Sequence, residues 1–169
     1  ETVIVFGGPN FPDSEEERAG FLKKYSSVDF YIIGEGEEGF VDLFKKLKTF
    51  GMNSAQLKEQ KERVQNCAYL SGEKLIIGER KRIDDLNRVP CPYQMGLLDP
   101  FFSMPLVPII ETTRGCPFQC TFCADGKKAA SRVFRYQEEK VTTTLEYIAN
   151  RVSGCDELII ADLNFGMYD

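Results

Sequence analysis

The sequence predicts an α/β protein that holds parts of two domains, each built from strand–helix units around a parallel sheet. Three features predict this fold class. Strand-like and helix-like segments alternate over residues 1–51 and again over 108–169, a proline-rich segment separates them, and glycines follow the strands. The 169-residue chain is 43 % apolar and 12 % aromatic, which is enough for a folded core.

Residues 1–51 contain two strand–helix units. A β-branched run over 2–8 (TVIVFGG) predicts a strand. The helix expected over 12–25 has a cap at Asp13 or Ser14, acidic residues in its first turn and lysines in its last. Two units form only part of a sheet, so we expect further strands before residue 1.

The second unit begins with a strand within residues 28–37 (VDFYIIGEGE), which runs into a glycine turn. A helix is expected over 37–51, ending at Gly51. Its apolar spacing predicts one buried face, formed by Phe40, Val41, Phe44 and Leu47.

Residues 52–107 are expected to link the two domains. A short polar helix is predicted within 54–63, and the segment 65–78 (QNCAYLSGEKLIIG) predicts a hairpin that turns at Ser71-Gly72. The subsequent residues are rich in proline and have no stable period, which is typical of an ordered connector.

A second α/β pattern occupies residues 108–169. Strands are predicted within 106–113 and 156–166, with a loop over 114–130 and a helix over 138–152 between them. The helix is expected to bury Val141, Leu145, Ile148, Ala149 and Val152. Because a complete β/α barrel needs about 250 residues, this region can hold only the first units of a partial TIM-type barrel.

Charge and composition exclude several classes of protein. The net charge of −5 argues against a broad nucleic-acid surface, although a local basic patch is compatible with it. No run approaches the ~18 apolar residues of a membrane span, and the start has no signal-peptide pattern. Because the chain does not begin with methionine, we interpret it as a processed or excised piece. Six unevenly spaced cysteines favour a metal site in a reducing cytoplasm over a disulfide framework.

Three of these cysteines, Cys116, Cys120 and Cys123, have C-x3-C-x2-C spacing directly after a predicted strand. Three thiolates can bind three irons of a 4Fe–4S cluster and leave the fourth iron open. A structural zinc site is an alternative, but it needs a fourth ligand in a chain without histidine. A ferredoxin would also need a fourth cysteine, and disulfides would leave one thiol unpaired. Cys67, Cys91 and Cys155 are treated as bystanders.

The segment ETTRGCPFQCTFC at 111–123 resembles the signature of the radical S-adenosylmethionine (radical SAM) superfamily. The segment VFRYQEEKVTTTLEYI resembles the stretch after the cluster loop in these enzymes, and LIIADLNFGMYD resembles their second barrel strand. VIVFGGPNFP, VDFYIIGEGEEGF and the connector are similar to the end of the cobalamin-binding-type domain and the linker of one subclass. The resemblance spans nearly the whole chain and identifies it as an internal piece of such an enzyme.

The resemblance implies a domain division: the end of a doubly wound, cobalamin-binding-like domain at 1–51, a linker with a hairpin at 52–107, and the start of a radical SAM barrel at 108–169. It also implies that the open iron binds S-adenosylmethionine, which is cleaved reductively to a deoxyadenosyl radical. Phe122 would contact the adenine through its backbone, or be a core aromatic. Asp162 and Asn164 would contact the methionine moiety, or cap the next helix.

Paired glycines also carry a prediction. Gly7, Gly8, Gly34 and Gly36 resemble the glycines that border the nucleotide tail of the cofactor in cobalamin domains, although any strand–helix turn can use glycine. The axial histidine of these domains is absent, since the chain has no histidine, so cobalamin binding stays open. Asp125, Lys127, Arg132 and Arg135 could meet substrate, or form a solvated basic face.

The resemblance implies cobalamin-linked methylation or a radical rearrangement of a small-molecule or peptide substrate, with an electron donor such as flavodoxin or ferredoxin. One alternative is a methylthiotransferase acting on RNA or protein, against which the absence of cysteine from residues 1–66 counts. A second is a ferredoxin-like carrier or zinc-stabilised module, with Cys91 or Cys155 as fourth ligand. We expect the isolated piece to be inactive or to aggregate.

Overall fold

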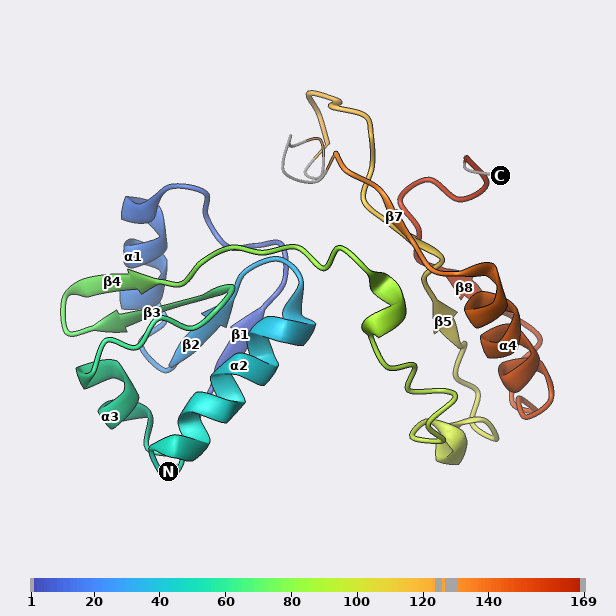
Figure 1. Cartoon of the computed structure of the whole chain (residues 1–169), viewed down its shortest axis with the longest axis horizontal. Coiled ribbons are helices and arrows are strands. Elements are labelled where there is room, and N and C mark those ends of the chain that lie inside the picture. Colours follow the sequence, from blue (N-terminus) through green and yellow to red (C-terminus); the bar gives the residue numbers. More distant parts are fainter. Residues whose placement is uncertain (1, 124–125, 127–130, 168–169) are drawn as a thin grey trace. The chain divides into compact units, whose positions relative to one another are not determined.

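The computed structural model describes residues 2–123, 126 and 131–167, and it divides into two compact units, Glu1–Ile83 and Asp84–Asp169 (Figure 1). The elements of the first unit are β1 (Val5–Gly7), α1 (Glu15–Lys24), β2 (Phe30–Ile32), α2 (Gly36–Thr49), α3 (Ser54–Glu59), β3 (Cys67–Ser71) and β4 (Lys74–Ile77). The second unit contains β5 (Ile109–Ile110), β6 (Thr113–Arg114), β7 (Phe134–Arg135), α4 (Glu138–Ala149) and β8 (Ile159–Ile160), with 3-10 turns at Leu86–Arg88 and Asp99–Phe101.

The first unit has a four-stranded mixed sheet in the order β1-β2-β3-β4. β1 and β2 are parallel, whereas β3 is antiparallel to both β2 and β4. The predicted hairpin is confirmed, and Gly72 adopts a φ of 58° in its turn. Through the pairs Tyr31↔Ala68 and Ile32↔Cys67, the hairpin is an integral part of the sheet.

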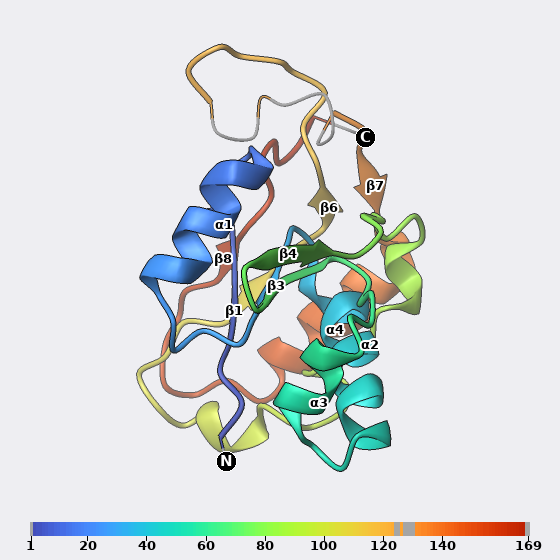
Figure 2. The same ribbon diagram turned by 90° about the vertical axis from the view of Figure 1, so that its left-hand side faces the viewer.

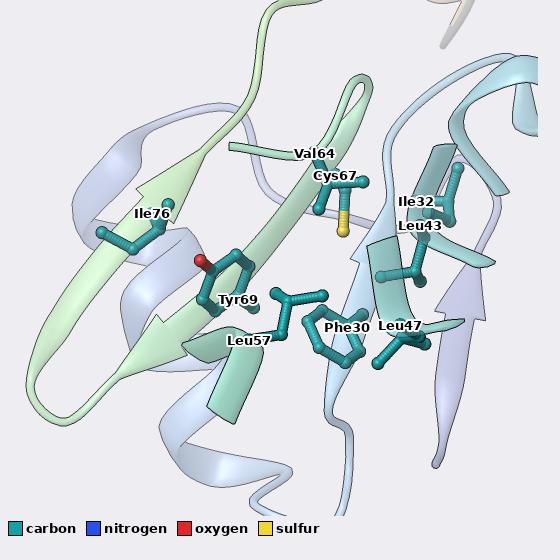
Figure 3. Packing of buried hydrophobic residues seen from close by; sticks show 9 residues of the cluster. All are labelled: Phe30, Ile32, Leu43, Leu47, Leu57, Val64, Cys67, Tyr69 and Ile76. Carbon is teal, nitrogen blue, oxygen red and sulfur yellow. The ribbon is translucent and has the colours of Figure 1, made fainter. Parts of the chain in front are cut away.

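Helices cover both faces of this sheet (Figure 2), because successive residues of β2 point to opposite sides. Phe30 and Ile32 pack into a cluster with residues of α2 and α3, whereas Tyr31 and Ile33 pack toward α1. Figure 3 shows the first cluster, which comprises Phe30, Ile32, Leu43, Leu47, Leu57, Val64, Cys67, Tyr69 and Ile76.

Both ends of α1 have the features that the sequence predicted for this helix. Ser14 caps α1 by accepting a hydrogen bond from the Glu17 amide at 3.2 Å, and three glutamates and two lysines occupy its first and last turns.

The buried face of α2 differs from the prediction. Gly39, Leu43 and Leu47 are buried, whereas the other predicted residues are exposed, namely Phe40, Val41 and Phe44. Only Leu47 of the predicted face is correct. The helix is rotated because Gly39 lets its backbone approach β2 and the residues just before β3: an added Cβ there would lie 3.3 Å from Ile32 Cγ2 and 3.0 Å from the Gln65 carbonyl oxygen.

The second unit contains a parallel strand pair with a helix between the strands in the chain, which is one β/α/β unit. β5 pairs with β8 (Figure 1), in the register Ile109↔Ile159 and Ile110↔Ile160. α4 packs its Ile148 into a core with Tyr93, Phe102 and Ile110. Leu145 and Val152 also contact this core, as predicted. Ala149 is exposed instead, and Thr144 is buried.

Residues just after Asp84 pack on α4 within the second unit. The Lys140 ammonium donates to the carbonyl oxygens of Asn87 and Val89, at 3.0 and 2.5 Å, and the Gln94 amide donates to Thr144 Oγ1 at 3.0 Å. Among the described residues, no helix has the length and apolarity that crossing a membrane requires.

Candidate functional site

The three clustered cysteines lie on the segment after β6. Cys116 is half-buried, Cys120 and Cys123 are exposed, and all three are free thiols. The Cys123 amide donates to the Cys120 carbonyl oxygen at 3.1 Å, and the Gly126 amide donates to the Cys123 carbonyl oxygen at 3.1 Å. The backbone between the second and third cysteines is therefore a tight turn that presents both thiols to solvent.

The chemistry of this donor set fits an iron–sulfur cluster, because thiolates are the usual protein ligands of iron–sulfur iron. The side chains are not gathered, however. Over residues 2–123, 126 and 131–167, no group of three or more histidine, cysteine, aspartate or glutamate side chains is arranged to hold a metal ion. The structure thus brings the three cysteines onto one exposed loop and does not bring their sulfur atoms together.

The base of this loop is built by three hydrogen-bonded connections. β6 and β7 pair in the register Thr113↔Arg135, and the Tyr136 amide donates to the Thr112 carbonyl oxygen at 3.0 Å. Arg114 donates from Nε and Nη2 to the Glu111 carboxylate, at 3.0 and 2.7 Å. Both ends of the cysteine-bearing segment are thereby held next to each other.

Asp162 belongs to this base. Both of its carboxylate oxygens accept hydrogen bonds from the backbone amides and hydroxyls of Thr112 and Thr113. The sequence suggested Asp162 as a contact to a cofactor, but in the structure both carboxylate oxygens are engaged by Thr112 and Thr113.

Asn164, two residues further on, is different. Its Nδ2 atom is buried and has no hydrogen-bond partner within the described part of the chain. A buried amide donor without an acceptor is costly, so it fits a site where a ligand supplies the acceptor. Phe122 is 91 % exposed, so the alternative that made it a core aromatic is wrong.

The predicted glycines lie at the carboxyl ends of the two parallel strands of the first unit. Gly8 and Gly34 adopt φ values of 105° and 75°, a conformation that glycine tolerates best. Gly7 and Gly36 have negative φ, and an added Cβ would meet only ordinary contacts. The Tyr31 hydroxyl donates to the Gly8 carbonyl oxygen at 3.2 Å, which fixes the turn after β1.

The remaining cysteines have other partners. Cys67 is buried in the core of the first unit, and this burial raises the pKa of its thiol to about 12. Cys91 contacts Thr144 Oγ1 at 3.5 Å, and the Cys155 thiol donates to the Leu106 carbonyl oxygen at 3.2 Å.

Of the four charged residues that could meet substrate, Arg132 and Arg135 are exposed. The Arg132 guanidinium lies 4.8 Å from the centre of the Phe134 ring. Asp125 and Lys127 lie outside the described residues.

Sequence reasoning missed Gly126. An added Cβ at Gly126 would lie 2.3 Å from the Cys120 carbonyl oxygen, so the loop needs glycine there. Its position three residues after Cys123 was the one available signal.

The second unit thus has a thiol-bearing loop shortly after the first strand of a β/α/β unit, and the first unit has an α/β sheet with helices on both faces, as the resemblance to radical SAM enzymes with a cobalamin-binding-type domain implies. Comparisons with known proteins confirm this resemblance: homologues of the chain include cobalamin-dependent radical SAM enzymes, and the chain matches an internal piece of them. No family profile matches the chain.

Over 98 % of its length, the chain is 28 % identical to the cobalamin-dependent radical SAM methyltransferase TokK of Streptomyces tokunonensis. It is 26 % identical, over the same share, to 2-(S-pantetheinyl)-carbapenam-3-carboxylate methyltransferase of Streptantibioticus cattleyicolor. The chain spans 24 % of the length of each relative.

Among solved structures, the cobalamin-dependent S-adenosylmethionine radical enzyme OxsB, with aqua-cobalamin and S-adenosylmethionine bound, has a TM-score of 0.68 to this chain. The match has 24 % identity and covers 96 % of this chain and 21 % of that one, so it shows the same fold.

Proposed function

We propose that the protein to which this chain belongs is a radical SAM enzyme that methylates, or rearranges, a small-molecule substrate with the help of cobalamin. In this proposal Cys116, Cys120 and Cys123 bind three irons of a 4Fe–4S cluster. The observation that carries the proposal is the set of three free thiols on one loop, which follows β6 and so comes shortly after β5, a parallel strand of the β/α/β unit. The homology to cobalamin-dependent radical SAM methyltransferases supports the same chemistry.

When bound, an open-iron cluster with S-adenosylmethionine supplies reductive cleavage of the cofactor to a deoxyadenosyl radical. In this proposal the residues of this chain bind the cluster and orient S-adenosylmethionine. The exposed turn that carries Cys120 and Cys123 can close on a cluster because its thiols have no competing core contacts. Asn164 would donate its buried amide to the cofactor, for which a carboxylate is a suitable acceptor. Phe122, nearly fully exposed, is free to present its backbone and ring to the adenine.

Cobalamin would lie at the carboxyl ends of β1 and β2, where ligands of parallel α/β sheets bind. Gly8 and Gly34 have positive φ angles at the two strand ends. At Gly8 an added Cβ would meet no atom within 4 Å, which leaves space for a ligand close to the main chain, whereas at Gly34 Arg80 Nη2 lies 3.6 Å from that position. Since the chain has no histidine, these residues cannot provide a histidine ligand to cobalt.

The proposal includes an electron donor of the flavodoxin or ferredoxin type, which reduces the cluster. It also includes a reducing compartment such as the cytoplasm, since unpaired thiols persist there. The relative from Streptantibioticus cattleyicolor is named for a carbapenam carboxylate, which favours a small molecule over a peptide as substrate.

The electron-carrier and zinc alternatives both need a fourth ligand from Cys91 or Cys155. Both thiols have partners in the region around α4, at Thr144 Oγ1 and the Leu106 carbonyl oxygen. These contacts favour three ligands over four.

The test is anaerobic reconstitution of the whole protein with iron and sulfide, and then electron paramagnetic resonance of the reduced sample. We expect a 4Fe–4S signal that shifts when S-adenosylmethionine is added. Cys116→Ala, Cys120→Ala and Cys123→Ala should each lose the cluster, whereas the matched controls Cys91→Ala and Cys155→Ala should keep it.

Two outcomes would contradict the proposal. A cluster signal that ignores S-adenosylmethionine, together with cluster loss in Cys91→Ala or Cys155→Ala, would indicate an electron carrier with four ligands. A protein that takes up zinc and no iron would indicate a structural metal site.

A further inference from the structure

The carboxylate of Asp162 lies beside the two residues that lead into the cysteine-bearing loop. β5 and β8 are parallel, with Ile110 opposite Ile160 in the register, and the Ala161 amide donates to the Ile110 carbonyl oxygen at 2.8 Å. Two residues beyond the paired positions, Thr112 and Asp162 therefore remain neighbours. The end of the second strand is thus held against the exit of the first.

Four donors converge on this one side chain. The Thr112 amide donates to Oδ1 at 2.6 Å, and the Thr113 amide donates to both oxygens at 3.1 Å. The Thr113 hydroxyl donates to Oδ2 at 3.0 Å, and the Thr112 hydroxyl donates to the same oxygen. A carboxylate can accept all four, because each oxygen has two lone pairs, whereas an asparagine side chain has one acceptor oxygen. Bonds to an ionised carboxylate are also stronger than neutral ones.

The part of the chain that Asp162 holds is the start of the loop. After Thr113, Arg114 is bound to Glu111, and Gly115 is buried with a φ of 108°. Cys116 comes directly afterwards. Few rotatable bonds separate the residues held by Asp162 from the first thiol, so releasing them would free Cys116 before the more distant cysteines.

We propose that Asp162 is a positioning residue that fixes Thr112 and Thr113 and thereby sets the place of Cys116, and that it does not contact the cofactor. The proposal rests on the proposed function of the three cysteines as cluster ligands. It assigns the two polar residues after β8 different tasks: Asp162 orders the loop, and the buried amide of Asn164 remains available to a ligand.

The first experiment uses the whole protein after anaerobic reconstitution and measures the rate at which a chelator removes iron. We expect Asp162→Ala to lose iron about tenfold faster than wild type, because it leaves all four donors without their acceptor. Asp162→Asn should lose iron a few-fold faster, since one acceptor remains. Thr113→Val removes one hydroxyl bond at nearly equal shape and should have a smaller effect in the same direction. The matched control Asp156→Asn, at an exposed aspartate of the same unit, should match wild type.

A second readout needs no cluster. In the metal-free protein, Cys116 is half-buried and Cys120 and Cys123 are exposed. If Asp162 places Cys116, alkylation of Cys116 should become several-fold faster in Asp162→Asn, while the rates at Cys120 and Cys123 stay unchanged. A general loss of stability would instead accelerate all three and lower the unfolding temperature.

The outcomes separate the two proposals. Wild-type rates of iron loss and of Cys116 alkylation in Asp162→Asn and Thr113→Val would overturn the positioning role, even with a cluster bound. A uniform increase at all three cysteines would overturn it too. Failure of the wild type to take up iron would overturn the proposed function, and the alkylation pattern would then decide on Asp162 alone.

Discussion

Gly126 and Cys120 are in backbone contact: a Cβ built on Gly126 would lie 2.3 Å from the carbonyl oxygen of Cys120 and 3.1 Å from its amide nitrogen. The contact joins the far side of the cysteine turn to its second cysteine. It requires glycine for space.

Gly126→Ala should therefore displace the turn that carries Cys120 and Cys123. We expect a several-fold lower iron content after reconstitution, with an unchanged unfolding temperature, because none of the three core clusters includes a residue of this turn. The matched control is Gly20→Ala in α1, where an added Cβ has no neighbour within 4 Å. Equal iron content in both variants would contradict the expectation.

The exposed apolar residues of α2 predict low solubility of the isolated chain. Phe40, Val41 and Phe44 are 52, 48 and 45 % exposed and are neighbours on the helix. Replacing all three by glutamine should raise the soluble yield of the 169-residue chain several-fold without unfolding it. Leu43→Gln, on the buried side, should instead abolish folding, since Leu43 is 1 % exposed. Sedimentation and circular dichroism would measure both effects, and a soluble, folded Leu43→Gln chain would show that the assigned face is wrong.

Asn66 predicts a stability effect in the first unit. Its side chain accepts from the Lys81 amide at 2.7 Å and donates to the Lys81 carbonyl oxygen at 2.8 Å, and the residue is 2 % exposed. Asn66→Ala should reduce the free energy of unfolding by about 2 kcal/mol, because both Lys81 groups lose their partner. Urea unfolding would measure this difference in free energy, in the chain in which Phe40, Val41 and Phe44 are replaced by glutamine. Asn10→Ala, at an exposed asparagine, should change stability by less than ~0.5 kcal/mol, and an equal loss in both variants would contradict the assignment.

Cys67 predicts a dependence of stability on pH. Its pKa is raised by burial from 9.0 to about 12 in the folded protein, so the folded state retains the thiol proton more strongly than the unfolded state. The resulting stability is fully present below about pH 9 and is lost as the pH rises toward about 12. Urea unfolding between these pH values would measure the loss. Cys67→Ala should weaken it without removing it, because burial also raises the pKa of Tyr69 to about 12.

The same shift predicts thiol reactivity. At about pH 8.5, Cys67 should alkylate at least about a hundredfold more slowly than the exposed Cys120 in the native chain, and at a similar rate in urea. Mass spectrometry of the alkylated peptides would measure the ratio. Comparable native rates at the two cysteines would mean that Cys67 is not in the core.

Local signals predicted the helices well, because caps and charges act within one or two turns. Ser14 and the flanking charges located α1, and apolar spacing located α4. The buried sides were predicted less well. Apolar periodicity favours the face of α2 with the bulkiest side chains, which contains Phe40 and Phe44. The face that packs on the sheet is the one in which Gly39 permits a close approach of the backbone.

Long-range pairing could not be predicted in the same way. Nothing in the local pattern of 65–78 says that Cys67 will pair with Ile32 in antiparallel orientation, since register depends on a partner distant in the sequence. At the candidate site, spacing and resemblance singled out Cys116, Cys120 and Cys123. The use of Asp162 by two threonines depends on the β5–β8 register, which only the fold provides.

The β6–β7 pair has a consequence for how this region can vary. The pairing of Thr113 with Arg135 brings the two ends of the intervening segment together. The strands therefore already compensate the entropy cost of closing that segment. Lengthening such a closed segment adds only about 0.6 kcal/mol for each doubling. Relatives could therefore exchange loops of quite different size here while leaving the strands and α4 untouched, and a protein engineer could graft a foreign loop onto the same two anchor positions.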